Sequence, residues 1–265
     1  MIEVEFAKQI ARLRTYTIIA VLAGIPIALP LIFKLGAGAG EHGGSFVSLA
    51  RESGLNVAIL TLDHMAPTVF LGVGAILAGS AVAEEASWGT LGYLLVRPVS
   101  RVRLLISKLA VAGALTLIGI ALATTVAVFG GLAAYGWQPV ETPSNGTVSP
   151  GDALVALAFA VPYMAWNLAG IMSIAFYVST RSNSPLYAAA TAFGVAVIAQ
   201  ILNSFSAMGD FRVILPTHYW TAWQDLLASS PSWDDMAKGV LLQAVYVILF
   251  LALAFWSFRR RDILT

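Results

Sequence analysis

The chain has 265 residues, of which 58% are hydrophobic and 11% are charged, and its mean hydropathy is +0.82. Soluble globular chains carry about 25% charged residues, so this composition excludes a water-soluble domain and indicates a polytopic membrane protein. The net charge of +1 provides no basic field for nucleic acid, and the absence of cysteine excludes disulfides, thiolate catalysis and cysteine-based metal sites.

The chain opens with an amphipathic segment, MIEVEFAKQIARLR. Ile2 and Phe6 lie on one face at helical spacing, whereas Lys8 and Arg12 lie one turn apart on another face. This pattern predicts a helix over residues 1–14 that lies flat in the membrane interface. The alternative is that these residues are only the polar start of the first span.

Six apolar stretches are long enough to cross a bilayer as helices, which takes about 20 residues each. We expect a single transmembrane domain over residues 1–265 with an all-α fold. The second span would begin at Met65 if Asp63 and His64 were not tolerated inside it. The predicted spans are 15–33, 57–83, 109–135, 153–180, 185–209 and 239–258.

Basic residues are distributed unequally between the two sides of these spans. Of the fifteen lysines and arginines, eleven fall on the side that holds both chain ends and four on the other. Cytoplasmic segments are enriched in lysine and arginine, so we expect both termini and residues 84–108 in the cytoplasm, at the plasma membrane of a bacterium or archaeon. The eleven are Lys8, Arg12, Arg14, Arg97, Arg101, Arg103, Lys108, Arg181, Arg259, Arg260 and Arg261.

Residues 204–238 connect the last two spans on the opposite side and are rich in aromatic side chains. Tyr219, Trp220, Trp223 and Trp233 are residue types that suit the membrane–water boundary. We therefore expect short interfacial or re-entrant helices in this segment and no separate domain.

A few polar residues in or near the spans are candidates for a substrate pathway, because polar groups in hydrocarbon are costly. For the amide side chains among them, hydrogen bonding between helices is the simpler expectation. For Asp63 and His64 the simpler expectation is a position in the outer headgroup region. The three histidines show no metal-ligand spacing, so we expect no metal site. The pathway candidates are Asp63, Asn167, Gln200 and Asn203.

The connection AEEASWGTLGYLLVRPVSRVRLLISK, between the second and third spans, is both charged and amphipathic. Its apolar stripe is formed by Trp88, Leu91, Leu94 and Leu95. An exposed apolar stripe on a short helix usually docks into a partner. Pro98 disfavours helix at Arg97, and Ser100 can cap the next helix. The alternative is a plain loop whose basic residues only orient the chain.

These features resemble the permease subunits of ABC-2-type transporters, and the resemblance extends to the six-span plan of the whole chain. The sequence FRRRDIL after the last span is also similar to that family. The residues that match in the connection are Glu84 or Glu85, Gly89, Thr90, Leu91, Leu94, Leu95, Pro98, Val99, Ser100, Arg101 and Lys108.

The resemblance implies that the connection is a coupling helix, which sits in a groove of a separate ATPase subunit. Residues 1–14 would be the elbow helix of the family. The complete transporter would contain two ATPase subunits, which bind ATP and Mg, and two permease chains, identical or related. The residues expected to couple to the ATPase are Glu84, Glu85, Trp88, Gly89, Thr90, Leu91, Leu94, Leu95, Arg97, Pro98 and Arg101.

The chain contains no G-x-x-x-x-G-K-[ST] motif, so ATP would be bound and hydrolysed by the partner, and this chain would be a non-catalytic permease without a cofactor of its own. Spans rich in alanine, valine and leucine, with few fixed charges, fit an amphiphilic or hydrophobic substrate such as a drug, an antibiotic or a lipid. We expect membrane lipid, and no nucleic acid, among its other partners.

Two other classes of function stay open. Glu84-Glu85 is similar to the E-E-x-x-x-R pattern of membrane CAAX-type proteases, but Gly89 occupies the position of the arginine. The other class is a passive channel or a scaffold, although repeated polar pore-lining positions are missing. An ATPase gene beside this one would favour the transporter.

Overall fold

The computed structural model describes residues 1–35, 50–90, 100–141, 146–228 and 230–260. Nearly all of these residues are helical, and a two-residue antiparallel hairpin, β1 (Val140–Glu141) with β2 (Thr147–Val148), accompanies the helices. The helices are α1 (Ile2–Ile10), α2 (Leu13–Lys34), α4 (Gly54–Met65), the π-helical turn η1 (Ala66–Phe70), α5 (Leu71–Ser87), α7 (Arg101–Tyr135), α8 (Pro150–Arg181), α9 (Pro185–Ser204), the 3-10 helices η2 (Ser206–Ile214) and η3 (Ala222–Leu227), and α10 (Asp234–Arg260).

Six helical stretches of the described residues are long and apolar enough to cross a membrane, which confirms the predicted all-α fold with six transmembrane helices. α4, η1 and α5 together form the second stretch, which begins at Gly54, so Asp63 and His64 lie inside it. The predicted end of the fifth span was wrong. α9 ends at Ser204, and Gly209 lies in η2 with a φ of 50°, which a right-handed helix does not accommodate.

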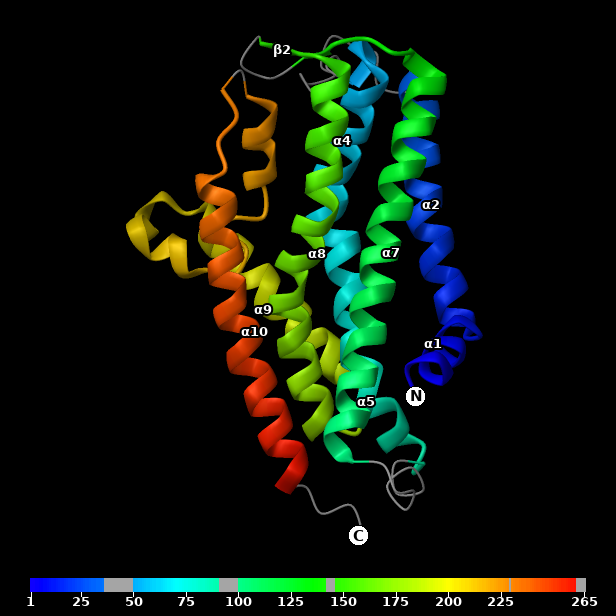
Figure 1. The fold of residues 1–265 in the computed structure, drawn as a ribbon, viewed down its shortest axis with the longest axis vertical. Coiled ribbons are helices and arrows are strands. Elements are labelled where there is room, and N and C mark those ends of the chain that lie inside the picture. The colour runs from blue at the N-terminus through cyan, green and yellow to red at the C-terminus, as the bar shows by residue number, and fades with distance from the viewer. Residues whose placement is uncertain (36–49, 91–99, 142–145, 229, 261–265) are drawn as a thin grey trace.

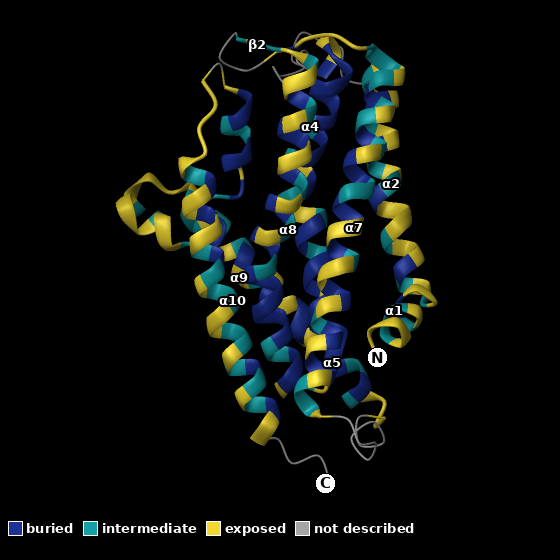
Figure 2. Cartoon of the chain, in the orientation of Figure 1, coloured by how far each residue is buried: buried dark blue, intermediate teal, exposed yellow. Residues whose placement is uncertain are grey.

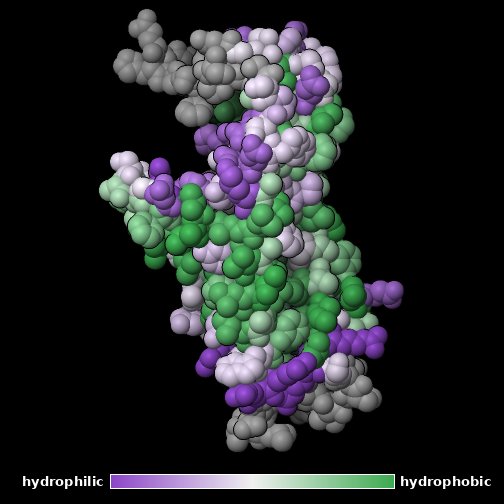
Figure 3. Space-filling model, turned by 60° about the vertical axis from the view of Figure 1, so that its left-hand side comes forward, coloured by the Kyte–Doolittle hydropathy of each residue, from purple (hydrophilic) through white to green (hydrophobic). Residues whose placement is uncertain are grey.

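α5 and α8 lie at the centre of the bundle. α8 packs against α5 and α10, α5 also packs against α9, and α7 packs against α2 and α4 (Figure 1). Buried residues accordingly gather on α4, α5 and α8, whereas α2 and α10 expose most of their surface (Figure 2). Figure 3 shows the exposed surface of one face as a hydrophobic band between hydrophilic regions. An apolar helix whose surface is exposed suits contact with lipid, and α2 and α10 have this character.

Four elements meet at one end of the bundle, which we call the termini end: α1, the end of α5, the start of α7 and the end of α10 (Figure 1). There the Arg101 guanidinium donates hydrogen bonds to the backbone carbonyls of Phe258 and Arg259, at 3.2 and 3.1 Å. The opposite end, which carries the β1–β2 hairpin, is the far end. Both chain ends thus lie toward one end of the bundle, as an even number of spans requires.

The predicted interfacial role of the aromatic residues in 204–238 was wrong for two of them. Trp223 is fully buried and Trp220 nearly so, because both pack into the protein core beneath η3. Trp233 is half exposed, and its ring stacks edge-on against Phe159 of α8 at 5.0 Å. Four further exposed apolar residues of this region lie on and beside η2: Phe205, Phe211, Val213 and Ile214.

Candidate functional site

Charged side chains from four helical segments converge at the termini end, and we call them the charge cluster. Acidic residues at the end of α5 face two arginines at the start of α2 and a lysine in the N-terminal part of α7. α1 contributes one residue of each sign. The cluster consists of Glu5, Lys8, Arg12, Arg14, Glu84, Glu85 and Lys108.

The centre of the charge cluster is a buried ion pair. Glu85 Oε1 lies 2.7 Å from Lys108 Nζ, and the two side chains are 2% and 1% exposed. Each has a second partner on α1: Lys8 Nζ lies 2.6 Å from Glu85 Oε1, and Glu5 Oε1 lies 3.1 Å from Lys108 Nζ. Two buried charges are tolerated when each is compensated in this way. α1, α5 and α7 are therefore held together as one unit.

A second group of contacts fixes the junction between α1 and α2. Glu84 forms ion pairs with Arg12 and, at 3.5 Å, with Arg14. The Arg12 guanidinium also lies over the Trp88 ring, 5.3 Å from its centroid, a cation–π geometry. The carboxylates that were expected to contact an ATPase thus contact the N-terminal segment of their own chain, Glu85 on α1 and Glu84 at the start of α2.

A helix forms within the predicted range of 1–14, but it is shorter than predicted, and its basic side chains contact carboxylates of the same chain. α1 ends at Ile10, and Leu13 already belongs to α2. Lys8 of α1 pairs with Glu85, and Arg12, which follows α1, pairs with Glu84. The exposed residues of α1 are mostly apolar, Ile2, Val4 and Ile10 among them, which suits the membrane interface.

Trp88, the first residue of the predicted stripe, lies at the end of a helix. α5 ends at Ser87, Trp88 caps it, and Gly89 has a φ of 67°, so α5 does not continue past Trp88. Thr90 closes this turn, where its backbone N–H donates to the Glu85 carbonyl at 3.0 Å. The remaining predicted coupling residues lie outside the described residues: Leu91, Leu94, Leu95, Arg97 and Pro98.

The predicted cap of the next helix is confirmed. Ser100 Oγ accepts a hydrogen bond from the Arg103 backbone N–H at 3.3 Å, at the start of α7.

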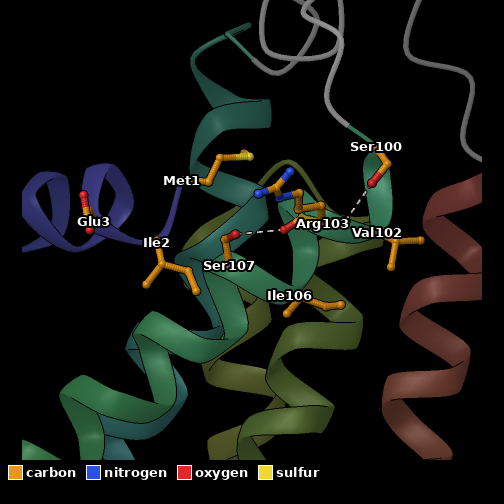
Figure 4. Close-up of a pocket in the computed structure, with 8 residues that line it drawn as sticks. All are labelled: Met1, Ile2, Glu3, Ser100, Val102, Arg103, Ile106 and Ser107. Atoms are coloured by element: carbon orange, nitrogen blue, oxygen red, sulfur yellow. Dashed lines mark hydrogen bonds between the residues drawn. The ribbon is translucent and has the colours of Figure 1, made fainter.

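Between this turn and the start of α1 lies an open cavity of about 530 Å³, which Figure 4 shows. Apolar Ile2, Val102 and Ile106 line it together with Arg103 and other polar groups. The cavity therefore lies between α1 and α7, two of the helices that the charge cluster joins.

A second cavity, of about 270 Å³, lies among η1, the end of α9 and the segment that leads into η3, and we call it the far pocket. It brings together three of the four pathway candidates, one from α4 and two from α9. Its lining residues are Asp63, Ala66, Pro67, Gln200, Asn203, Thr217, His218, Trp220, Thr221 and Trp223.

Pro67 explains the shape of the helix on one side of the far pocket. Proline lacks the N–H that would bond the carbonyl four residues earlier, and its ring clashes with that carbonyl. The helix widens here into the π-helical turn η1, a feature that often occurs at functional sites. The Pro67 carbonyl accepts a hydrogen bond from Gln200 Nε2 at 3.3 Å, which ties the turn to α9.

The other polar groups of the far pocket are arranged by two further hydrogen bonds. Gln224 Nε2 donates to Asp63 Oδ1 at 2.7 Å, and His218 Nδ1 lies 2.7 Å from Asn203 Oδ1. Burial, and next the charge of Arg212, lower the pKa of His218 below its usual value, so the ring is neutral at neutral pH. Because a carbonyl oxygen only accepts, Nδ1 carries the proton toward Asn203, and Nε2 is an acceptor.

Two buried groups at the far pocket have no hydrogen-bond partner within the described residues: Thr217 Oγ1 and Trp220 Nε1. Both side chains are more than nine-tenths buried. An unsatisfied buried donor costs about 1–3 kcal/mol, so such groups usually have a partner. The pocket therefore offers donors on this wall, and acceptors at Asp63 and His218.

The fourth pathway candidate, Asn167, lies outside the far pocket. Its amide nitrogen donates to the Tyr163 carbonyl of the same helix at 2.9 Å, and its oxygen accepts from Gln243 of α10 at 3.4 Å, a hydrogen bond between two helices. It borders only a small void of about 10 Å³ beside Trp220. Within the described residues, no three histidine, aspartate or glutamate side chains are placed to hold a metal ion.

Sequence reasoning missed the pocket residues that come from the segment 215–227. Thr217, His218 and Gln224 face Asp63 and α9 only because this segment folds back over the ends of the helices. The available signal was the run PTHYWTAWQD, in which polar and aromatic residues alternate irregularly. It was interpreted as a boundary segment because aromatic residues are common at membrane surfaces.

The fold defines the chain as an all-α, polytopic membrane protein. It belongs to the DUF2705 family, described as a protein of unknown function, whose model matches residues 46–264. It is also similar to the uncharacterized protein YhcI of Bacillus subtilis strain 168. The two are 27% identical over 243 residues, covering 82% of this chain and 72% of that protein.

Proposed function

We propose that this chain is the permease subunit of an ATP-driven exporter of the ABC-2 type, which moves an amphiphilic or hydrophobic substrate. Two such chains, identical or related, would form the translocation pathway. Two copies of a separate ATPase subunit would bind ATP and Mg and drive alternating access. The proposal rests on the sequence resemblance in residues 84–108, together with the six-helix plan.

The observation that carries the proposal is the charge cluster. A coupling element must pass a displacement to the spans, and the connection between α5 and α7 begins and ends beside Glu85 and Lys108. The buried ion pair joins both helices to α1, so a push on the connection would move three elements together. A plain loop would need no such buried charges, which are costly to desolvate.

The test of coupling co-expresses this chain with an ABC-type ATPase from the same organism, taken from beside its gene if one is encoded there. In the variant Trp88→Ala with Leu91→Ala, we expect the affinity for the ATPase to fall roughly thirtyfold, the effect of about 2 kcal/mol at an interface anchor. Trp88 is 58% exposed, so its loss leaves the bundle intact. The measurement is capture of the ATPase on the tagged permease, beside transport-coupled ATP hydrolysis.

The matched control for this test is Trp137→Ala, which removes an equally exposed tryptophan at the far end of the bundle. It should capture the ATPase as the unchanged chain does. Failure of the unchanged chain to capture any ATPase would contradict the proposed function. Full capture and full coupling by the Trp88/Leu91 variant would remove the coupling role of these two residues.

The orientation proposed for the chain puts the termini end in the cytoplasm, because eleven of the fifteen basic residues lie on that side. Single cysteines can report it, since the chain contains none. We expect Ser100→Cys to react with an impermeant maleimide only after the cells are permeabilised. Gln138→Cys, exposed at the far end, should react in intact cells, and the reverse pattern would invert the topology.

A further inference from the structure

The far pocket contains the carboxylate of Asp63, on which the neighbouring His64 acts electrostatically. Asp63 lies within the second membrane-crossing stretch and accepts one hydrogen bond, from Gln224. Among the residues that the structure describes, no lysine or arginine forms an ion pair with it. A carboxylate at this depth is expensive unless a cation or a set of donors compensates it. Glu85, by comparison, forms ion pairs with the ammonium groups of Lys8 and Lys108.

The groups around Asp63 add acceptors on one wall and donors on another. Neutral His218 donates through Nδ1 to Asn203, which leaves Nε2 as an acceptor. Thr217 Oγ1 and Trp220 Nε1 are buried donors without a partner in the described part of the chain. A ligand that satisfies both walls must carry hydrogen-bond donors, preferably cationic, and an oxygen acceptor close to them.

The size and surroundings of the far pocket restrict the ligand further. A cavity of about 270 Å³ admits a polar head group and is smaller than the usual site for a whole drug-sized molecule, about 300–1,000 Å³. α9, which contributes Gln200 and Asn203, runs directly into η2, where Phe205 and Phe211 expose their rings. An apolar chain attached to the head group would find these rings and the surrounding lipid beside the pocket.

We propose that the far pocket binds the ammonium head group of an amphiphile, with Asp63 as its counter-ion and with Thr217 and Trp220 donating to an adjacent oxygen of the ligand. The role of such a molecule as exported substrate rests on the proposed function. Its binding to the pocket does not, because every group involved belongs to this chain.

The binding experiment uses the purified full-length chain in maltoside micelles, without any ATPase, and radiolabelled dodecylamine as the probe. Dodecanol supplies the same chain without the charge, and ethanolamine supplies an ammonium and an oxygen without the chain. We expect saturable binding of dodecylamine, at least tenfold weaker in Asp63→Asn, which keeps an acceptor for Gln224 but removes the charge. Trp220→Phe should weaken the binding of ethanolamine severalfold, because ethanolamine carries the oxygen that dodecylamine lacks.

The matched control is Asp152→Asn, an exposed aspartate at the start of α8 that should bind dodecylamine like the unchanged chain. Dodecanol binding should not respond to Asp63→Asn. If ethanolamine binds as tightly as dodecylamine, the apolar chain contributes nothing to binding. The ligand would then be a water-soluble amine, and the proposal of an amphiphile would be overturned. Equal affinity of Asp63→Asn and the unchanged chain for dodecylamine, or no saturable binding at all, would overturn the ammonium site. A chain that binds dodecylamine but never associates with an ATPase would contradict the proposed function alone.

Discussion

Glu85→Gln should lower the free energy of unfolding by about 3 kcal/mol, the lower end of the range for breaking a buried ion pair. The change removes the negative charge shared by Lys8 and Lys108, and Lys108 is only 1% exposed, so its ammonium cannot be rehydrated without opening the cluster. Glu5 remains 3.1 Å from Lys108, which limits the loss. The measurement is equilibrium unfolding of the purified chain in mixed micelles of maltoside and dodecyl sulfate.

A matched control exists on α10, where Asp235 and Lys238 form an ion pair of 2.6 Å, as short as that of Glu85 with Lys8 but exposed to solvent. Asp235→Asn should leave the unfolding midpoint within experimental error, because solvent screens exposed pairs. The double variant Glu85→Leu with Lys108→Met should recover part of the lost stability, since it removes the two most deeply buried charges together and leaves only the more exposed Glu5 and Lys8. Equal midpoints for Glu85→Gln and Asp235→Asn would show that the buried cluster contributes no stability.

Gly79→Ala is expected to destabilise the bundle by about 1–3 kcal/mol through overpacking. A Cβ at Gly79 would lie 2.7 Å from the backbone nitrogen of Ala189 and 2.9 Å from its Cα. Both atoms are backbone, so α5 and α9 must move apart to accommodate the methyl group. Because Asn203 of α9 and Asp63 of the same membrane-crossing stretch line the far pocket, this separation should also weaken dodecylamine binding.

Gly113→Ala is the control for this change. Gly113 lies within α7, and a Cβ there has no described atom within 4 Å. Alanine favours helix over glycine by up to about 1 kcal/mol, so this variant should be neutral or more stable than the unchanged chain. Unfolding midpoints of the two variants, measured side by side, test the close approach of α5 and α9. A Gly79→Ala midpoint equal to that of Gly113→Ala would contradict it.

The stability of the charge cluster bears on the proposed function. If the connection between α5 and α7 transmits force, Glu85→Gln should reduce transport-coupled ATP hydrolysis more than it reduces capture of the ATPase. The reason is that Glu85 is buried and holds α1, whereas the connection itself is unchanged. Trp88, exposed beside Arg12, would act at the interface instead.

The sequence by itself determined the class of the protein and its six membrane-crossing helices. This was possible because a span needs only about 20 apolar residues in a row, a local property that composition and charge reveal directly. The same kind of local signal predicted the Ser100 cap, which depends on a side chain and a backbone N–H three residues apart. It also singled out Asp63, Gln200 and Asn203, because polar residues are conspicuous in apolar surroundings.

Only the tertiary structure decided what those residues touch. Glu85 and Lys8 are 77 positions apart, and Asp63 and Gln224 are 161 apart, so no local pattern in the sequence pairs them. Basic residues on an amphipathic helix are equally compatible with lipid phosphates and with protein carboxylates, and packing at the termini end selects the carboxylates. Trp223 likewise suits either a membrane boundary or a core. η3, which carries Trp223, packs against α8 and α10 and buries it, because a large aromatic side chain gains more from close packing than from partial exposure.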